Sequence, residues 1–290
     1  MPRLSLAPVM AREIFGERKF PREPEPDLVM DDPEQVAAYS HAGRIDGVMS
    51  AAYLYHSAQI SRVIQGKSRV LDLGCGPATQ LGQVAELNPE ISFLGVDLSE
   101  TMLDSGRKYV DKLGLKNVQF QHDDITVLKS IPDASVDAVM STVVLHHLPT
   151  RQHLDDCFRQ VSRVLKPGGA VYLTDFGRLK SLKSVLFFAY MNAEHQPHLF
   201  SLDYERSLRA AFLLEDFQDA AKRFLPSSVG VLSTFQVPFL IFVKTPSGDL
   251  PAAKAERIKA LRASLPRTYR KDLDELRFFC KLGGLDDPIR

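Results

Sequence analysis

The chain has 290 residues with 36 basic and 36 acidic side chains, so its formal net charge at pH 7 is zero. This balance excludes a nucleic-acid-binding surface spread over the whole chain and leaves room only for a local basic patch. Hydrophobic residues make up 44% and charged residues 25%, which is typical of a globular protein. A chain of this length can bury a sizeable core without disulfides or structural metals.

The three cysteines, Cys75, Cys157 and Cys280, are odd in number and lie far apart. They form neither a disulfide framework nor a zinc site with paired spacing, and we interpret them as reduced thiols. The first residues have no sustained apolar run of the kind found in signal peptides, and the other apolar runs are too short to span a bilayer. We therefore expect a cytoplasmic protein that binds neither membranes nor nucleic acid.

Residues 1–30 are rich in proline and charge, and prolines alternate with glutamates over 21–26. Each proline removes a backbone donor and biases its predecessor towards extended geometry. This segment is therefore predicted to be a linker or a surface arm and not a packed element. A helix is expected to start near Asp32, with Pro33 in its first turn, and a second helix to cover about 48–64.

From Lys67 onward, short apolar segments alternate with amphipathic ones. The expected strands cover 69–73, 91–96, 118–122, 136–141 and 170–174. The expected helices between them end at Leu87, cover 99–113 and cover 151–165. Strands that alternate with helices indicate parallel pairing, so the pattern predicts an α/β fold with a doubly wound sheet covered on both faces.

The alternation stops after the fifth expected strand. Residues 176–225 are helical in pattern and rich in aromatic side chains. Two further strands are expected at 229–236 and 239–244. The tail from Thr245 begins as a loop and continues as helices over 252–264 and near 271–281.

The most informative segment is V-L-D-L-G-C-G-P-A-T, in which Gly74 and Gly76 form the turn between the first strand and its helix. Glycines at such a turn let the backbone approach a ligand and present the amides of the helix N-terminus. A dinucleotide site requires a third glycine where Thr79 stands, so the dinucleotide fingerprint fails. Asp72 would repel a pyrophosphate and favour a cationic group instead.

Two further acids extend this motif. Asp97 ends the second strand about 20 residues after the glycines, where a carboxylate can accept hydrogen bonds from ribose hydroxyls. Asp124 follows the third strand, where it can accept from an exocyclic amine. Each acid alone could equally be a helix cap or a solvated loop residue. Together with Asp72, they match a ligand that has a ribose, an adenine amine and a cationic amino acid but no phosphate. S-adenosylmethionine is such a ligand.

With these motifs, the sequence resembles the class I S-adenosylmethionine-dependent methyltransferases, and is most similar to the small-molecule branch with the ubiquinone/menaquinone-type and arsenite-type enzymes. The matching stretches, in family order and spacing, are VLDLGCG (70–76), GVDLSETML (95–103), FQHDDI (120–125), VVLHHL (143–148) and RVLKPGG (163–169). The resemblance covers about 30–175 and extends to 229–244 as the family's terminal antiparallel strand pair. It implies a seven-stranded Rossmann-like sheet in a methyltransferase domain over 67–245, with a cap inserted at about 177–226. An N-terminal arm with lid helices over 1–66 and a helical extension over 246–290 complete the expected organisation.

The resemblance implies how the methionine end of the cofactor is held. Asp72 and the backbone near Gly74 and Gly76 would bind its amino and carboxylate groups. Ser141 and Thr142, at the end of the fourth strand, would line the mouth through which the methyl group passes. We count Ser141 with the cofactor site and Thr142 with the acceptor site.

The resemblance also implies how the adenosine end is held. Asp97 would bind the ribose diol, and Leu98 and Met102 would pack on the adenine ring. Asp124 would bind the adenine amine, and the amide of Ile125 would reach the ring. The product left in this site after transfer would be S-adenosylhomocysteine.

Methyl transfer from a sulfonium depends mainly on alignment, and a base is needed only if the nucleophile must lose a proton. His146 and His195 are the candidate catalytic bases. His146 lies in the VVLHHL motif, where the usual role of the pair with His147 is structural. His195 lies in the cap with His198, and the two are either ordinary loop histidines or groups that orient the acceptor and take its proton. This second pair lacks a third ligand, so no metal site is expected.

The acceptor is expected to contact the cap and the lid. Its candidate binding residues are Tyr39, Thr142, Tyr190, His198 and Tyr204. The aromatic residues of the cap either pack it onto the sheet or line an apolar pocket for a flat aromatic, quinone, polyketide-like or lipid substrate. The fourth strand ends in M-S-T-V and not in the N-P-P-Y of enzymes that methylate adenine or glutamine amides. The cysteines do not supply the converging thiolates that arsenite requires.

We therefore expect a methyltransferase that acts on a small molecule, with oxygen as the favoured acceptor atom and carbon, sulfur and nitrogen still open. The chain is expected to be a monomer or a homodimer, and its C-terminal extension packs either on its own domain or on a second subunit. Two rival functions are a nicotinamide-dependent oxidoreductase, which Thr79 and Asp72 oppose, and a regulatory protein that binds the cofactor without turnover.

Overall fold

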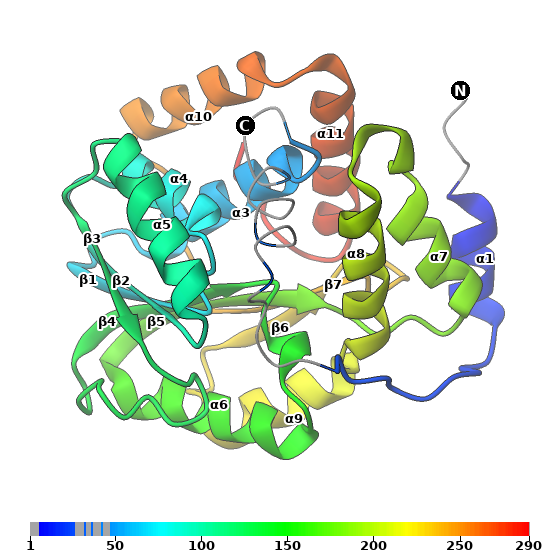
Figure 1. Ribbon diagram of the computed structural model, residues 1–290, viewed down its shortest axis with the longest axis horizontal. Coiled ribbons are helices and arrows are strands. Elements are labelled where there is room, and N and C mark those ends of the chain that lie inside the picture. Colours follow the sequence, from blue (N-terminus) through cyan, green and yellow to red (C-terminus); the bar gives the residue numbers. More distant parts are fainter. Residues whose placement is uncertain (1–5, 27–31, 33–35, 37–41, 43–46, 290) are drawn as a thin grey trace.

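The computed structural model describes residues 6–26, 32, 36, 42 and 47–289. A seven-stranded sheet forms its centre (Figure 1). The strands are β1 (Arg69–Leu73), β2 (Ser92–Asp97), β3 (Val118–His122), β4 (Val136–Thr142), β5 (Leu165–Phe176), β6 (Gly230–Ser233) and β7 (Leu240–Lys244). They lie in the order β3-β2-β1-β4-β5-β7-β6. Strands β1 to β5 run parallel, whereas β7 is antiparallel to both of its neighbours.

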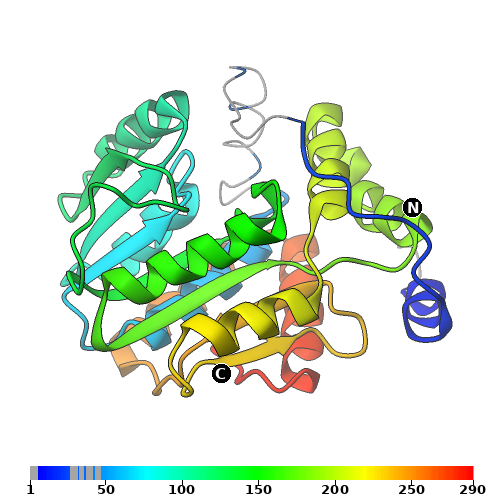
Figure 2. The same ribbon diagram turned by 90° about the horizontal axis from the view of Figure 1, so that it is seen from below.

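The helices cover both faces of the sheet. They are α1 (Ala7–Phe15), α3 (Ser50–Val63), α4 (Thr79–Leu87), α5 (Glu100–Lys112), α6 (Arg151–Val164), α7 (Leu182–Tyr190), α8 (His198–Ala210), α9 (Leu214–Phe224), α10 (Ala252–Ser264), α11 (Arg267–Leu282) and the short 3₁₀ helices η1 (Leu145–His147) and η2 (Ala193–His195). Helices α3, α4 and α5 lie on one face, and α6 and α9 on the other (Figures 1 and 2). Because successive strand residues point to opposite faces, Val70 of β1 joins the core under α3 and α4, whereas Leu71 and Leu73 join the core under α6 and α9. The predicted doubly wound α/β fold is confirmed.

The element boundaries follow the sequence pattern closely, with differences at strand and helix ends. Strand β3 occupies the expected residues 118–122. Strand β5 is longer than the expected 170–174, because Leu165 already pairs with Val136 of β4 ahead of an irregularity in the register. Helix α11 begins earlier than expected because Pro266 occupies its N-cap position.

The N-terminal segment differs from the prediction. Residues 7–15 form helix α1, which buries Val9 and Glu13 and packs beside α7 (Figure 1). The prediction that residues 1–30 would not pack is therefore wrong for 6–26, because long-range contacts that the proline pattern does not reveal hold the segment in place. The helix expected from Asp32 falls largely outside the described residues, and Tyr39 falls outside them as well.

The C-terminal extension packs on α3 of the same chain through α10 and α11. The Gln59 side chain donates to the carbonyl oxygen of Asp286 at 2.7 Å, and Arg62 donates to that of Gly248 at 2.8 Å. The three cysteines are buried and unpaired. Within the described part of the chain, no helix has both the length and the apolar character needed to cross a bilayer.

Candidate cofactor and acceptor site

The carboxyl ends of β1, β2 and β4 surround a cavity of about 230 Å³. In open α/β sheets this edge is where ligands bind, because the strands end there and the following helices begin. The cavity brings together most of the residues that the sequence assigned to the cofactor. Those that line it are Asp72, Gly74, Gly76, Asp97, Leu98, Met102, Asp124, Ile125 and Thr142.

The glycine turn after β1 is held by the carboxylate of Asp97. The backbone amide of Gly76 donates to Asp97 Oδ2 at 2.8 Å, and the amide of Ser99 donates to Asp97 Oδ1 at 2.9 Å. Gly74 has φ of 65°, and a Cβ atom at this position would lie 2.5 Å from Cγ1 of Val144. Glycine is therefore required at this position both for its backbone conformation and for the close approach of the β4–η1 turn.

Two carboxylates of this cavity, those of buried Asp72 and half-buried Asp97, lie close enough to affect each other's charge. Asp72 is 3% exposed, and burial together with the charge of Asp97 raises its pKa well above the ordinary value. Burial also raises the pKa of Asp97, although hydrogen bonds from backbone amides oppose this. Two carboxylates that disfavour each other's ionisation suit a positively charged ligand, which would restore both charges. The two carboxylates therefore suit the positively charged ammonium and sulfonium groups of S-adenosylmethionine and not a phosphate.

The adenosine end has apolar walls and an ordered acidic loop. Leu98, Met102 and Ile125 line it, as apolar packing on an adenine ring requires. Asp124 Oδ1 accepts hydrogen bonds from the amide of Thr126 at 2.8 Å and from its hydroxyl at 2.7 Å. These bonds fix the loop after β3 and hold the Asp124 carboxylate at the cavity wall.

A second cavity of about 220 Å³ adjoins the first and is lined mainly by apolar and aromatic side chains. Its walls come from α1, the cap, β7 and α11, including Val9, Phe188, Tyr204 and Leu276. Val143, in the turn after β4, lines both cavities. Its φ of 57° is unfavourable for a β-branched residue, and such strain is typical of functional sites. The two cavities therefore meet at a strained backbone position.

Several residues expected near the acceptor lie elsewhere. Ser141 is fully buried and donates its hydroxyl to the carbonyl oxygen of Leu73 at 2.8 Å, so it joins β4 to β1 and does not line either cavity described here. The Tyr190 hydroxyl donates to Glu205 at 2.9 Å, away from both cavity walls. His195 and His198 are exposed on the solvent side of the cap, because α7 and α8 turn their aromatic side chains inwards. Of the cap residues assigned to the acceptor, the structure places only Tyr204 in the apolar cavity.

His146 is buried beside the site. Its Nδ1 lies 2.7 Å from Asp175 Oδ1, and its backbone amide donates to Asp175 Oδ2 at 2.8 Å. Its ring faces a small cavity of about 30 Å³ that shares Val143 and Tyr204 with the apolar cavity. The carboxylate of Asp175, at the end of β5, therefore fixes the position of this histidine.

The sequence analysis did not identify Arg22 and Glu25, whose contacts hold residues 16–26 against η1 and α8. Arg22 donates to four carbonyl oxygens, those of His146, Leu148, Pro149 and Ala210, at 2.6–2.9 Å. The carboxylate of Glu25 lies 3.2 Å from Nδ1 of His147. The only sequence signal for these contacts was the presence of charged residues between prolines. Such a pattern does not indicate which groups the charges contact.

Comparison with known proteins shows what this chain is similar to. Residues 64–205 match the model of a methyltransferase domain. The 27-O-demethylrifamycin SV methyltransferase of Amycolatopsis mediterranei is 34% identical over 39% of this chain and 40% of its own length. The demethylmenaquinone methyltransferase of Listeria welshimeri is 35% identical over 39% of this chain and 46% of its own length. The arsenite methyltransferase of Aquipseudomonas alcaligenes is 32% identical over 44% of this chain and 38% of its own length, so the chain spans less than half of each relative.

Solved structures share the fold at lower identity. A methyltransferase from Aquifex aeolicus described as dependent on S-adenosylmethionine matches with a TM-score of 0.53 and 17% identity, over 75% of this chain and all of its own. The plantazolicin methyltransferase BpumL, solved in complex with S-adenosylhomocysteine, matches with a TM-score of 0.53 and 14% identity, over 82% of this chain and 94% of its own. Over residues 64–205, the chain is therefore similar to the class I S-adenosylmethionine-dependent methyltransferases of the small-molecule branch.

Proposed function

We propose that this protein transfers the methyl group of S-adenosylmethionine to a small, largely apolar molecule. The observation that carries the proposal is the meeting of an acidic cofactor cavity and an apolar cavity at Val143. Oxygen of a flat aromatic, quinone or polyketide-like compound is the favoured acceptor, because the second cavity has aromatic walls with few polar groups. Carbon, sulfur or nitrogen as the acceptor atom, and a regulatory role without turnover, are the alternatives.

The residues of the first cavity would divide the cofactor between them. Asp72 and the glycine turn would hold the methionine end, and Asp97 would accept the ribose hydroxyls while it keeps its bonds to backbone amides. Bound in this way, S-adenosylmethionine supplies an electrophilic methyl group. The chain then has to align the acceptor and exclude water, which together can lower the barrier by roughly 7–11 kcal/mol.

The apolar cavity would hold the acceptor against the methyl-transfer mouth. Thr142 lines the cofactor side of this mouth and Tyr204 the acceptor side. We assign no general base, because Nδ1 of His146 is held by Asp175 and its Nε2 lies 3.7 Å from the carboxylate of Glu25. Alignment without a base suffices for an acceptor that is ionised before it binds.

The first test is calorimetric titration of the protein with S-adenosylmethionine, S-adenosylhomocysteine and NADH. We expect S-adenosylmethionine and S-adenosylhomocysteine to bind and NADH not to bind. Binding of NADH alone would contradict the proposal. Turnover is then measured as S-adenosylhomocysteine formed with a panel of phenols, hydroquinones, thiols and amines. Cofactor binding without turnover on any class would favour the regulatory alternative.

The acceptor cavity has a matched pair of variants on one helix. Leu276 lines the cavity, whereas Leu282 on the same helix is 47% exposed. Leu276→Gln is expected to raise KM for the acceptor several-fold without changing the Kd for S-adenosylmethionine, because a polar group would stand in the apolar wall. Leu282→Gln is expected to change neither value. Equal KM values in both variants would place the acceptor elsewhere.

A further inference from the structure

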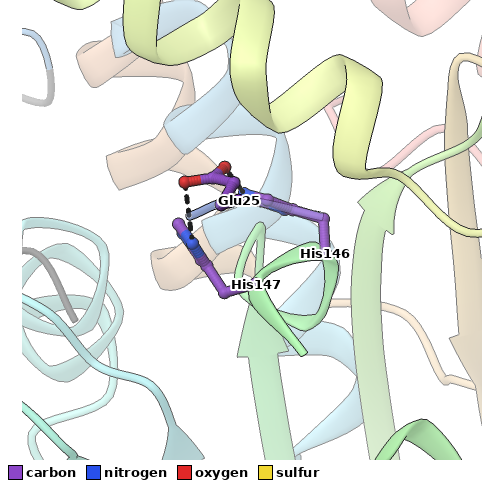
Figure 3. A group of neighbouring side chains, drawn as sticks. All are labelled: Glu25, His146 and His147. Carbon is purple, nitrogen blue, oxygen red and sulfur yellow. Dashed lines mark ion pairs between the residues drawn. The ribbon is translucent and has the colours of Figure 1, made fainter. Parts of the chain in front are cut away.

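Three side chains that come from distant parts of the sequence meet beside the acceptor cavity. Glu25, from the N-terminal segment, lies against both His146 and His147 of η1 (Figure 3). Its Oε2 lies 3.2 Å from Nδ1 of His147, and its Oε1 lies 3.7 Å from Nε2 of His146. One ligand-type atom from each residue lies within 4.8 Å of the others. The side chains of Glu25 and His146 are 8% and 2% exposed.

The Nε2 atom of His146 has no hydrogen-bond partner among the described residues. When Nδ1 carries the proton that it shares with Asp175, Nε2 presents a lone pair. This lone pair faces a carboxylate oxygen of Glu25 across a gap too long for a hydrogen bond. Two buried acceptors that face each other repel unless a proton or a metal cation lies between them.

Two further carboxylates surround this point. Asp175 lies behind His146, and Asp203 lines the same cavity of about 30 Å³ as both histidines. Burial, reinforced by the charge of Glu25, raises the pKa of Asp203 to about 6. The guanidinium of Arg22 is near, but it is directed at backbone carbonyl oxygens. The carboxylates of Glu25, Asp175 and Asp203 therefore all lie near the two histidines, beside a cavity of about 30 Å³.

An ion pair between His147 and Glu25 is the competing explanation of the cluster. Burial alone would lower the pKa of His147, but the hydrogen bond and the charge of Glu25 outweigh this and raise it. That ion pair accounts for only one oxygen of the Glu25 carboxylate, Oε2. It leaves Nε2 of His146 without a hydrogen-bond partner among the described residues, so it explains only part of the arrangement.

We propose that Glu25, His146 and His147 form a binding site for a divalent transition-metal ion. Imidazole and carboxylate together suit Zn²⁺, Co²⁺, Mn²⁺ or Fe²⁺ better than Mg²⁺ or Ca²⁺, which prefer oxygen alone. Ligands at about 2.0–2.2 Å from a tetrahedral ion stand roughly 3.3 Å apart, and the two closest ligand pairs here are 3.2 and 3.7 Å apart. Asp175 would orient His146 through Nδ1, as carboxylates do behind metal-bound histidines.

The test is titration of the metal-free protein, without an affinity tag, with Zn²⁺ by calorimetry and with Co²⁺ by visible absorption, each without cofactor or acceptor. One ion per chain is expected, with Co²⁺ bands of four- or five-coordination, and no comparable binding of Mg²⁺. Glu25→Gln and His147→Asn are each expected to weaken binding by at least about tenfold, and Asp175→Asn by about 10–100-fold. His198→Ala removes an exposed histidine and is expected to leave the affinity unchanged.

Circular dichroism and urea unfolding show whether each variant is folded, so a loss of metal affinity is interpreted only in folded protein. Absence of stoichiometric binding to the wild-type protein overturns the proposal. Binding that survives Glu25→Gln and His147→Asn in folded variants also overturns it. Because no readout uses turnover, the metal site and the proposed methyl transfer can fail independently.

Discussion

The carboxylate of Asp97 accepts a hydrogen bond from the backbone amide of Gly76 across 2.8 Å, which ties the end of β2 to the turn after β1. The same carboxylate accepts from the amide of Ser99 at the start of α5. One side chain therefore sets the shape of the cofactor cavity and also presents the acceptor oxygens that a ribose requires. Changes at this residue are expected to affect both roles.

Asp97→Asn keeps the size of the side chain but leaves one acceptor atom where there were two. Hydrogen bonds to a charged group contribute about 1.5–3 kcal/mol, so the Kd for S-adenosylmethionine is expected to rise roughly 10–100-fold. Calorimetry measures this directly. Asp111→Asn, at an exposed position of the following helix α5, is the control and is expected to bind like the wild type. Equal affinity in the two variants would place the ribose away from Asp97.

Binding of S-adenosylmethionine is expected to strengthen as pH rises. Burial and the charge of Asp97 raise the pKa of Asp72 in the free protein, and a cationic ligand favours the ionised carboxylate, so binding releases a proton below that raised pKa. Calorimetry in buffers of different ionisation enthalpy measures the proton released. Adenosine, which lacks the charged groups, is expected to show no such release, and neither is Asp72→Asn with S-adenosylmethionine. A proton release of equal size for adenosine would contradict the assignment.

Asp72→Asn is also expected to stabilise the ligand-free protein. A carboxyl whose folded-state pKa is raised contributes its stability below the unfolded pKa, and this contribution is lost as pH rises through the folded pKa. At neutral pH the wild-type residue therefore lowers the free energy of unfolding, and the neutral amide removes that cost. Urea unfolding at pH 7 should show a higher free energy for the variant, and a lower one would show that Asp72 stabilises the ligand-free fold.

Gly74→Ala is expected to cost more than backbone strain alone. The added Cβ would lie 2.5 Å from Cγ1 of Val144, in addition to about 1–2 kcal/mol for a left-handed conformation. Gly114→Ala provides the control, since Gly114 has φ of 69° but no atom within 4 Å of an added Cβ. Urea unfolding is expected to show the larger loss for Gly74→Ala, with weakened cofactor binding in that variant alone. Equal losses would mean that the β4–η1 turn moves freely.

Arg22→Lys is expected to loosen the N-terminal segment. A single ammonium cannot reach four carbonyl oxygens in the fixed geometry of a guanidinium, which also stacks 3.8 Å from the ring centre of Phe212. A loss of roughly 2–3 kcal/mol is expected, with faster proteolysis within residues 16–26. Arg18→Lys, at an exposed position of the same segment, should match the wild type in both measurements. Unchanged proteolysis in Arg22→Lys would show that other contacts hold the segment.

The cofactor half of the site could be predicted from the sequence because its residues belong to local motifs. Asp72, Gly74 and Gly76 lie within one turn, and Asp97 and Asp124 each end a strand whose position the apolar pattern reveals. The ends of adjacent parallel strands necessarily meet at one edge, so spacing along the chain carries the spatial information. Ser141 was misplaced because the pattern does not say which side of the strand end faces the cavity.

The acceptor half of the site depends on contacts between residues that are distant in the sequence. Patterns in a single sequence do not encode such contacts. Arg22 reaches carbonyl groups that are 124 to 188 residues away, and no periodicity links them. His195 and His198 drew attention by residue type, but the packing of α7 and α8 turns that edge of the cap to solvent. Residue type indicates chemistry, and only the tertiary packing determines which chemistry reaches the cavity.

The N-terminal segment also constrains the order in which the molecule can be completed during synthesis. Arg22 leaves the ribosome long before His146, Leu148 and Ala210, the residues whose carbonyl groups it binds. A nascent chain that stops before Ala210 can pair β1 to β5, yet its guanidinium still lacks one of its partners. Because its partners are made late and long loops close at only a modest entropic cost, docking of residues 16–26 is expected among the last steps of maturation. A chain that ends before α11 would also lack one wall of the apolar cavity.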